Sequence, residues 1–240
     1  MRYVISDIHG CYEEFIELLE KINFSSSDEL YILGDVMDRG PEPIKVMQKM
    51  MEMENVFFIL GNHDFVMYKN MKKLAVEITE ENAEEYLDSD DIADYIMWIQ
   101  EGGNTTSQKF KELSRSQQQD MLSYIEEAEL YEEIFVDDKR FVLVHAGLNE
   151  FDEAKDLEDY QLEDFMFYRA DYGRRYFSDE NTWLVTGHTP VIKIRDDKKP
   201  YIYKENGHIA VDCGCIYGEH LAAYCFETGE EFYVKRKADK

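Results

Sequence analysis

Apolar and polar positions along the first sixty residues predict strands and helices in turn. Short apolar runs at residues 3–6, 30–33 and 56–60 predict strands. Between the first two runs, residues 11–22 carry an apolar stripe at helical spacing, and Pro41 marks the expected start of a second helix. Strands and helices that alternate with short connections predict a parallel sheet.

The remainder of the chain divides into a helix-like part and a strand-rich part. Residues 65–130 are charged and helical in pattern, with a break at Gly102-Gly103-Asn104, and we expect a helical insertion that covers one end of the sheet. A strand is predicted at residues 182–186. Three hairpins are also predicted, pairing residues 133–136 with 140–144, 201–203 with 209–211 around Asn206-Gly207, and 221–226 with 231–235. Because no repeat, low-complexity linker or clear boundary interrupts the pattern, we expect one α/β domain over residues 1–240.

Composition and charge narrow the range of partners. A hydrophobic content of 44% with 14% aromatic residues is typical of a folded globular protein. The formal net charge of -26 argues against binding to nucleic acid or to an anionic membrane, because both would be repelled over most of the surface. The N-terminus does not resemble a signal peptide and the longest apolar runs are strand-sized, so we expect a soluble, cytoplasmic protein.

The cysteines give little indication of function. Cys11, Cys213, Cys215 and Cys225 form no Cys-x-x-Cys pair, and we expect reduced, partly buried thiols. A redox pair or metal site at Cys213-Gly-Cys215 remains an alternative, although its spacing fits no familiar zinc pattern.

Side chains that bind metals follow five of the predicted strands. Because ligands bind at the carboxyl ends of the strands in open α/β sheets, we expect these loops to lie side by side. Each residue alone is more often structural, but five such loops together favour a metal site. Mixed Asp, Asn and His ligands suit Mn, Fe or Zn better than Ca or Mg alone. These residues are Asp7 and His9, Asp35, which could bridge two cations, Asn62, His145 and His188.

The same residues lie in short blocks that resemble a known family. In order and approximate spacing, the blocks are similar to those of the phosphoprotein-phosphatase branch of the calcineurin-like metallophosphoesterases. In its short length the chain resembles the bacterial and phage serine/threonine protein phosphatases and the symmetrical diadenosine-tetraphosphate hydrolases. The resemblance implies an α/β sandwich of central β-sheets flanked by helices. The blocks are Asp7-Ile8-His9-Gly10, Gly34-Asp35-Val36-Met37-Asp38-Arg39-Gly40, Gly61-Asn62-His63-Asp64, His145-Ala146-Gly147 and Gly187-His188-Thr189-Pro190.

The resemblance also implies a role for each residue of these blocks. Two divalent cations, of Mn, Fe or Zn, would be bound, and a hydroxide between them would attack phosphorus directly. His63 would protonate or hydrogen-bond the leaving oxygen, and Asp38 would orient the ring of His63. Arg39 and Arg169, with Asn62, would bind the substrate phosphate. The first cation would be held by Asp7, His9 and Asp35, and the second by Asp35, Asn62, His145 and His188.

The expected function is therefore metal-dependent hydrolysis of phosphomonoesters, with phosphorylated Ser, Thr or Tyr in proteins or peptides, or a small phosphoester, as substrate. The alternative is a dinucleoside polyphosphate hydrolase of the diadenosine-tetraphosphate type, because the same metal centre serves both reactions. A non-catalytic binding module is a third hypothesis, which the complete set of ligands disfavours. The oligomeric state is not determined by the sequence, and His208 and His220 fit no block, so we expect them to be structural.

Overall fold

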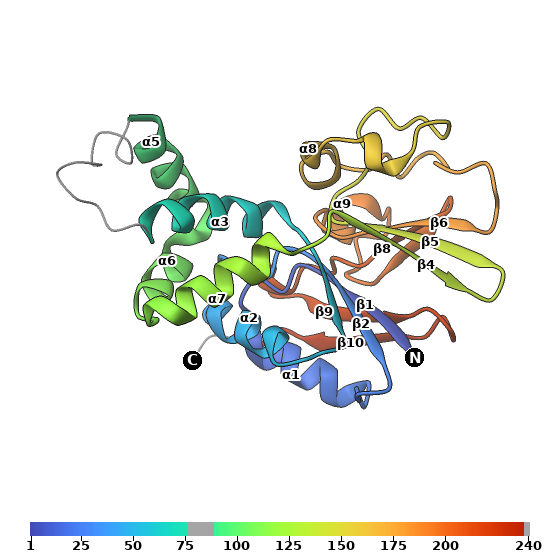
Figure 1. Cartoon of the computed structure of the whole chain (residues 1–240). Helices are drawn as coiled ribbons and strands as arrows, with labels where there is room; N and C mark the ends of the chain where they lie inside the picture. Colours follow the sequence, from blue (N-terminus) through green and yellow to red (C-terminus); the bar gives the residue numbers. More distant parts are fainter. Residues whose placement is uncertain (76–88, 238–240) are drawn as a thin grey trace.

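The computed structural model of the chain describes residues 1–75 and 89–237, which form two five-stranded sheets (Figure 1). In spatial order, the first sheet consists of β10 (Glu231–Lys235), β9 (His220–Cys225), β1 (Arg2–Ile5), β2 (Glu29–Leu33) and β3 (Val56–Ile59). The second consists of β4 (Tyr131–Val136), β5 (Lys139–Val144), β6 (Thr182–Thr186), β8 (His208–Ala210) and β7 (Tyr203–Glu205).

Both sheets are mixed. The expected parallel arrangement of β1, β2 and β3 is confirmed, and β9 and β10 extend that sheet by antiparallel pairing. In the second sheet β5, β6 and β8 are parallel, whereas β4 and β7 are antiparallel edge strands. The three predicted hairpins are confirmed as β4–β5, β7–β8 and β9–β10.

Two helices follow the first two strands, as the apolar pattern predicts. They are α1 (Tyr12–Lys21) and α2 (Pro43–Met51), which lie below the first sheet in Figure 1. The predicted start of α2 at Pro41 is wrong, because the helix begins at Pro43. The preceding residues are held in a loop instead: the N–H of Glu42 donates to the carbonyl oxygen of Gly10, 3.0 Å away, which ties the loop to the one that follows β1.

Helices fill the described part of the segment that was expected to be helical. They are α3 (Asn62–Leu74), α5 (Ser89–Trp98), the π-helical turn η1 (Ile99–Gly103), α6 (Asn104–Lys111) and α7 (Arg115–Glu126). They gather on one side of the first sheet, at the left in Figure 1. Residues 76–88, which the same expectation included, lie outside the described residues.

The long connections in the second half of the chain carry only short helical turns. These are η2 (Leu157–Asp159), α8 (Leu162–Met166), α9 (Val191–Ile194) and η3 (Cys215–Tyr217). The last two follow β6 and β8 and carry residues that line the site described below.

Alternating side chains of the strands form two apolar layers, as strand geometry requires. Val4 and Leu33 point from the first sheet into a cluster that also contains Leu143 and Val185 of the second, so this cluster joins the sheets face to face. Their neighbours Ile5 and Ile32 point to the opposite face and pack in the cluster that includes α1 and α2. The two sheets therefore form the centre of a sandwich with helices outside, which confirms the expected fold class.

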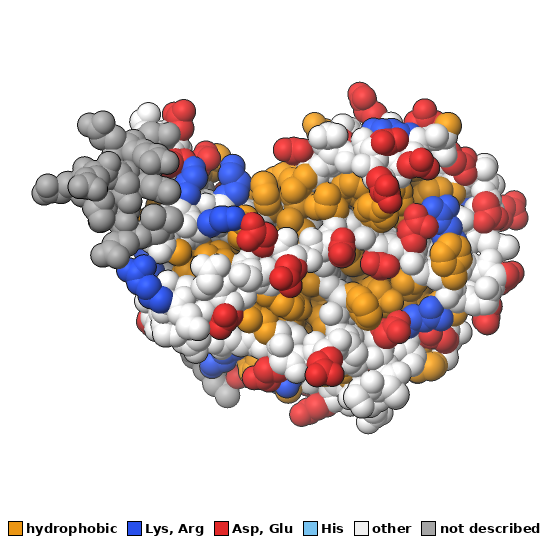
Figure 2. All heavy atoms as spheres, viewed as in Figure 1, with side chains coloured by type: hydrophobic (Ala, Val, Ile, Leu, Met, Phe, Trp, Pro, Cys, Tyr) orange, Lys and Arg blue, Asp and Glu red, His pale blue; other side chains and the backbone are white. Residues whose placement is uncertain are grey.

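Charge is spread over the surface. Figure 2 shows Asp and Glu side chains scattered across the visible face, with hydrophobic side chains between them. No helix in residues 1–75 or 89–237 is long and apolar enough to cross a membrane. All four cysteines are buried free thiols.

Candidate metal centre

The side chains predicted to bind metals meet at the carboxyl ends of the strands. Asp7 follows β1, Asp35 follows β2 and Asn62 begins α3 directly after β3. From the second sheet, His145 follows β5 and His188 follows β6. The two sheets thus present their strand ends to one shared site, and all six predicted ligands converge there.

One group of ligand atoms is close enough to surround a cation. Oδ1 of Asn62 lies 2.9 Å from both Nε2 of His145 and Nδ1 of His188, and these two nitrogens are 3.1 Å apart. Oδ1 of Asp35 is 3.4 Å from Nε2 of His145. Ligands about 2.1 Å from one cation and at right angles are ~3 Å apart. The donor types and their spacing therefore fit a divalent cation.

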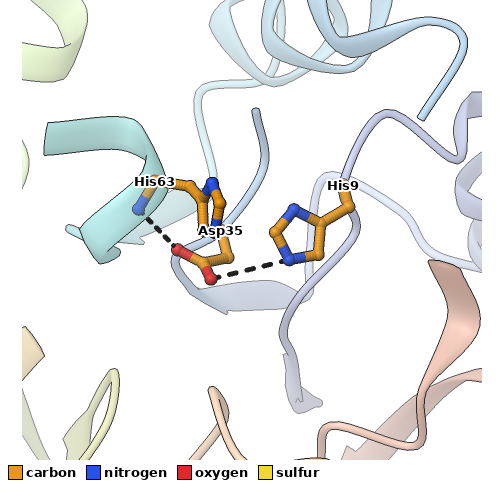
Figure 3. Close-up of side chains that lie close together, drawn as sticks. All are labelled: His9, Asp35 and His63. Atoms are coloured by element: carbon orange, nitrogen blue, oxygen red, sulfur yellow. Dashed lines mark hydrogen bonds and ion pairs between the residues drawn. The ribbon is translucent and has the colours of Figure 1, made fainter. Parts of the chain in front are cut away.

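A second group lies near the other oxygen of Asp35, and Figure 3 shows this oxygen directed toward the ring of His9. Oδ2 of Asp35 is 3.6 Å from Nε2 of His9, which is 4.0 Å from Oδ1 of Asp7. Nδ1 of His9 donates to the carbonyl oxygen of Met37, 2.8 Å away, so that Nε2, the ring nitrogen on the side of Asp35, carries the lone pair. The two oxygens of Asp35 thus face two different groups of ligands, as a bridging carboxylate would.

Backbone conformation shows how firmly these residues are held. Six of the predicted site residues have positive φ, a region that non-glycine residues rarely adopt and that costs ~1–2 kcal/mol for each residue. Backbone hydrogen bonds between loops hold this conformation: Asp7 N–H donates to Gly34 O, and His9 N–H to Asp35 O. Such strain is concentrated at functional sites. The φ values are 50° for Asp7, 43° for His9, 53° for Asp35, 70° for Asp38, 66° for Arg39 and 60° for His188.

The electrostatics of the site also favour a cation. Burial, and then the neighbouring charge of Asp35, raise the pKa of Asp7 to about 6. Burial lowers the pKa of His9 and of His188 to about 3, so both rings are neutral at neutral pH, the form in which an imidazole can bind a cation. Buried carboxyls that oppose each other's ionisation, next to unprotonated imidazoles, are stabilised when a cation binds between them.

His63, Asp38 and Arg39 form a second set beside the ligands. Oδ2 of Asp38 lies 2.9 Å from Nδ1 of His63, as the predicted pair requires. Burial opposes a charge on His63, but the carboxylates of Asp35 and Asp38 raise its pKa above the ordinary value. Arg39 lies between two rings, with Nη1 2.7 Å from Nε2 of His9 and Nη2 2.6 Å from Nε2 of His63. The single lone pair on Nε2 of His9 can either accept a hydrogen bond from Arg39 or bind a cation. Arg39 would therefore have to move away from His9 for a cation to bind at Nε2.

The predicted phosphate-binding residues line the same cavity, of about 50 Å³. Arg169 donates to Oγ1 of Thr189 at 2.8 Å and to the carbonyl oxygen of His188 at 3.3 Å, which holds it next to a ligand. Lys193 of α9 also lines the cavity, although the sequence analysis did not identify it. Three cationic side chains therefore surround an otherwise acidic cluster.

Asp212 is a further residue that the sequence analysis missed. It follows β8, is 4% exposed and lines the cavity, and burial together with the nearby Asp7 raises its pKa. The rule applied to the other strand ends would have identified it, because it directly follows the predicted strand 209–211. By contrast, His208 and His220 do not line the cavity.

Comparison with known proteins places this geometry in a family. The model of the calcineurin-like phosphoesterases matches residues 2–214. A relative from Geobacillus sp. (strain WCH70), named bis(5'-nucleosyl)-tetraphosphatase PrpE (asymmetrical), is 28% identical over 261 residues, covering 96% of this chain and 92% of its own. A symmetrical bis(5'-nucleosyl)-tetraphosphatase from Buchnera aphidicola is 40% identical over 99 residues, covering 40% of this chain and 36% of its own.

Solved structures show the same fold at lower identity. A structure described as a candidate diadenosine tetraphosphatase has a TM-score of 0.64 and 19% identity, covering 99% of this chain and 94% of its own. A protein serine/threonine phosphatase from Saccharomyces cerevisiae has a TM-score of 0.53 and 12% identity, with 100% and 80% coverage. At these identities the likeness concerns the fold alone.

Proposed function

Because the chain belongs to the calcineurin-like phosphoesterase family, we propose that it is a metal-dependent hydrolase of dinucleoside polyphosphates. The observation that carries the choice of substrate is the full-length similarity to relatives named bis(5'-nucleosyl)-tetraphosphatases, which extends over 96% of this chain. The protein phosphatase from Saccharomyces cerevisiae shares 12% identity and supports the fold only. Hydrolysis of dinucleoside polyphosphates, the alternative in the sequence analysis, is thus better supported than dephosphorylation of proteins.

In this proposal Asp7, His9 and Asp35 would hold one divalent cation, and Asp35, Asn62, His145 and His188 would hold a second. Such cations would supply Lewis-acid chemistry toward phosphate oxygens and would lower the pKa of a bound water molecule. For His63 to act on the leaving oxygen, Arg39 would have to move away from Nε2, which it contacts at 2.6 Å. Nε2 would then carry the proton for the leaving oxygen, while Asp38 accepts from Nδ1 and orients the ring.

The cationic side chains around the cavity favour a substrate with several phosphate groups. Arg39, Arg169 and Lys193 all line it, in a chain whose net charge is -26. A planar guanidinium can bind two oxygens of one phosphate group. A single scissile phosphate, already held by metals, does not require all three, so we assign Arg169 and Lys193 to the neighbouring phosphates.

An aromatic side chain at the edge of the cavity supports a nucleoside at the end of the phosphate chain. Tyr217 lines the cavity and is 59% exposed, and its ring centroid lies 5.9 Å from Cζ of Arg39. An exposed ring beside a phosphate-binding arginine is suited to stack on a base. Such stacking contributes ~1–3 kcal/mol per base.

The test compares kcat/KM for diadenosine tetraphosphate and for phosphopeptides with the same Mn²⁺-loaded protein. We expect the dinucleotide to be preferred, and Tyr217→Ala to lower its kcat/KM by roughly 5- to 100-fold. The inhibition constant of inorganic tripolyphosphate, which has no base, should not change. Tyr201→Ala is the matched control, because Tyr201 is also an exposed tyrosine but stacks on His220 and does not line the cavity. A preference for phosphopeptides would favour a protein phosphatase instead.

A further inference from the structure

A tryptophan of the helical segment contacts the pair formed by His63 and Asp38. Trp98, the last residue of α5, is 1% exposed, and its indole N–H donates to Oδ2 of Asp38 at 2.8 Å. The same oxygen lies 2.9 Å from Nδ1 of His63. One carboxylate oxygen therefore accepts hydrogen bonds from both rings.

The other carboxylate oxygen of Asp38 does not fix the side chain. Oδ1 is buried and has no hydrogen-bond partner in the described part of the chain. The orientation of the carboxylate thus depends on the two donors at Oδ2. Without the indole N–H, only His63 would hold Asp38, and rotation of the carboxylate would leave the imidazole without its acceptor.

The backbone around Asp38 is held by the same helical segment. The N–H of Asp38 donates to Oγ1 of Thr106 at 3.0 Å, and the N–H of Arg39 donates to the carbonyl oxygen of Gly102 at 2.9 Å. The glycine pair seen in the sequence is therefore more than a break between helices. Gly103 packs so closely on Trp98 that a Cβ atom there would lie 2.2 Å from Cε2 of the indole.

We propose that Trp98 is a positioning residue, which acts through Asp38 to keep His63 aligned with the leaving oxygen. The inference rests on the proposed role of His63, which gives its Nε2 proton to the leaving oxygen as the P–O bond breaks and becomes neutral. Alignment matters most where the leaving group is a poor one, because a good leaving group departs without protonation. Trp98 therefore affects reactions of poor leaving groups and has little effect on good ones.

Trp98→Phe tests this role, since it keeps an aromatic ring and removes the donor. The measurement is kcat/KM for aryl phosphoesters whose leaving groups range from 2,4-dinitrophenol to phenol. We expect a loss of roughly 10- to 100-fold with phenol and little change with 2,4-dinitrophenol. Retained activity on the second ester also shows that the variant is folded and loaded with metal. Gly103→Ala, which displaces the indole without removing it, should give the same selective loss.

Trp183→Phe is the matched control. Trp183 carries an indole too, but it lies on β6 near Arg175 and Lys204 and does not line the cavity. Its replacement should leave the dependence on the leaving group unchanged. A readout independent of activity is the NMR resonance of the Trp98 indole N–H. Comparison with Trp183→Phe, which lacks the other indole, assigns this resonance. That resonance should shift in Asp38→Asn even in protein without metal.

The outcomes separate the inference from the function on which it rests. An equal loss on all esters in Trp98→Phe, or no loss at all, would overturn the positioning role. His63→Gln must show the same selective loss, and to a greater extent. If His63→Gln instead affects good and poor leaving groups alike, the proposed role of His63 fails, and the inference about Trp98 fails with it. An indole resonance that does not respond to Asp38→Asn would also overturn it.

Discussion

At the scale of single residues, the site could be predicted because its polar and charged side chains follow the ends of apolar strands. Asp35 and His145 stand directly after short apolar runs, where parallel strands bring side chains together. Contacts between distant segments could not be predicted in this way. Arg39 between two imidazoles and Trp98 on Asp38 depend on how the helical segment packs, which no local pattern encodes.

Asp7 leads to a prediction about pH. Its pKa is raised to about 6, so below that pH a cation must displace a proton from the carboxyl, whereas above it the carboxylate is already free. The affinity for Mn²⁺ should fall as pH decreases through 6, by up to about tenfold per pH unit. His9 and His188, with pKa values of about 3, do not titrate in this range.

Calorimetric titration of metal-free protein between about pH 5 and 7.5 measures this dependence. Asp7→Asn is the control variant, and it should bind more weakly and lose the part of the pH dependence centred near 6. An affinity of the wild-type protein that is the same at both ends of this range would refute the assignment of Asp7 as a ligand.

At the scale of elements, the turns that carry strong local signals were predicted best. Asn206-Gly207 connects β7 and β8 with φ values of 52° and 72°, as a two-residue hairpin turn requires. The start of α2 was predicted wrongly from Pro41, because a contact between loops overrides the local signal there. A helix-start signal states where a helix can begin, and packing decides where it does.

Gly34 tests whether the loops after β2 and β3 must touch. It has a φ of 73°, and a Cβ atom there would lie 2.4 Å from the Cα of Gly61 and 2.9 Å from Nδ1 of His145. Gly34→Ala should lower the free energy of unfolding by more than ~2 kcal/mol and weaken metal binding, because it forces the ligand loops apart.

The matched control for this change is Gly218→Ala. Gly218 has a φ of 90° but nothing lies within 4 Å of the added carbon, so it carries the backbone penalty without the clash. Urea unfolding and metal titration of both variants separate the two effects. Equal losses of stability, with metal binding retained in both, would show that the close approach of the loops is not required.

At the scale of the whole molecule, the sequence identified the reaction better than the substrate. The predicted ligands belong to strand ends of both sheets and appear in the sequence as short blocks, whereas the walls of the cavity come from separate connections. Lys193 lies in α9 and Tyr217 ends η3, and neither belongs to those blocks. Acidic side chains are scattered over the face shown in Figure 2, whereas three cationic side chains, Arg39, Arg169 and Lys193, line the cavity. A polyanionic substrate therefore suits the cavity rather than the surface around it.

The central claim is that two cations sharing Asp35 make this chain a phosphoesterase. The most direct measurement titrates Mn²⁺ into chelated protein and determines bound metal and hydrolysis of diadenosine tetraphosphate in the same samples. We expect activity in the wild-type protein to rise in step with metal until two ions are bound per chain. Asp35→Asn should bind less metal and show no hydrolysis under the same conditions. Full activity in the chelated wild-type protein, or in Asp35→Asn, would contradict the account.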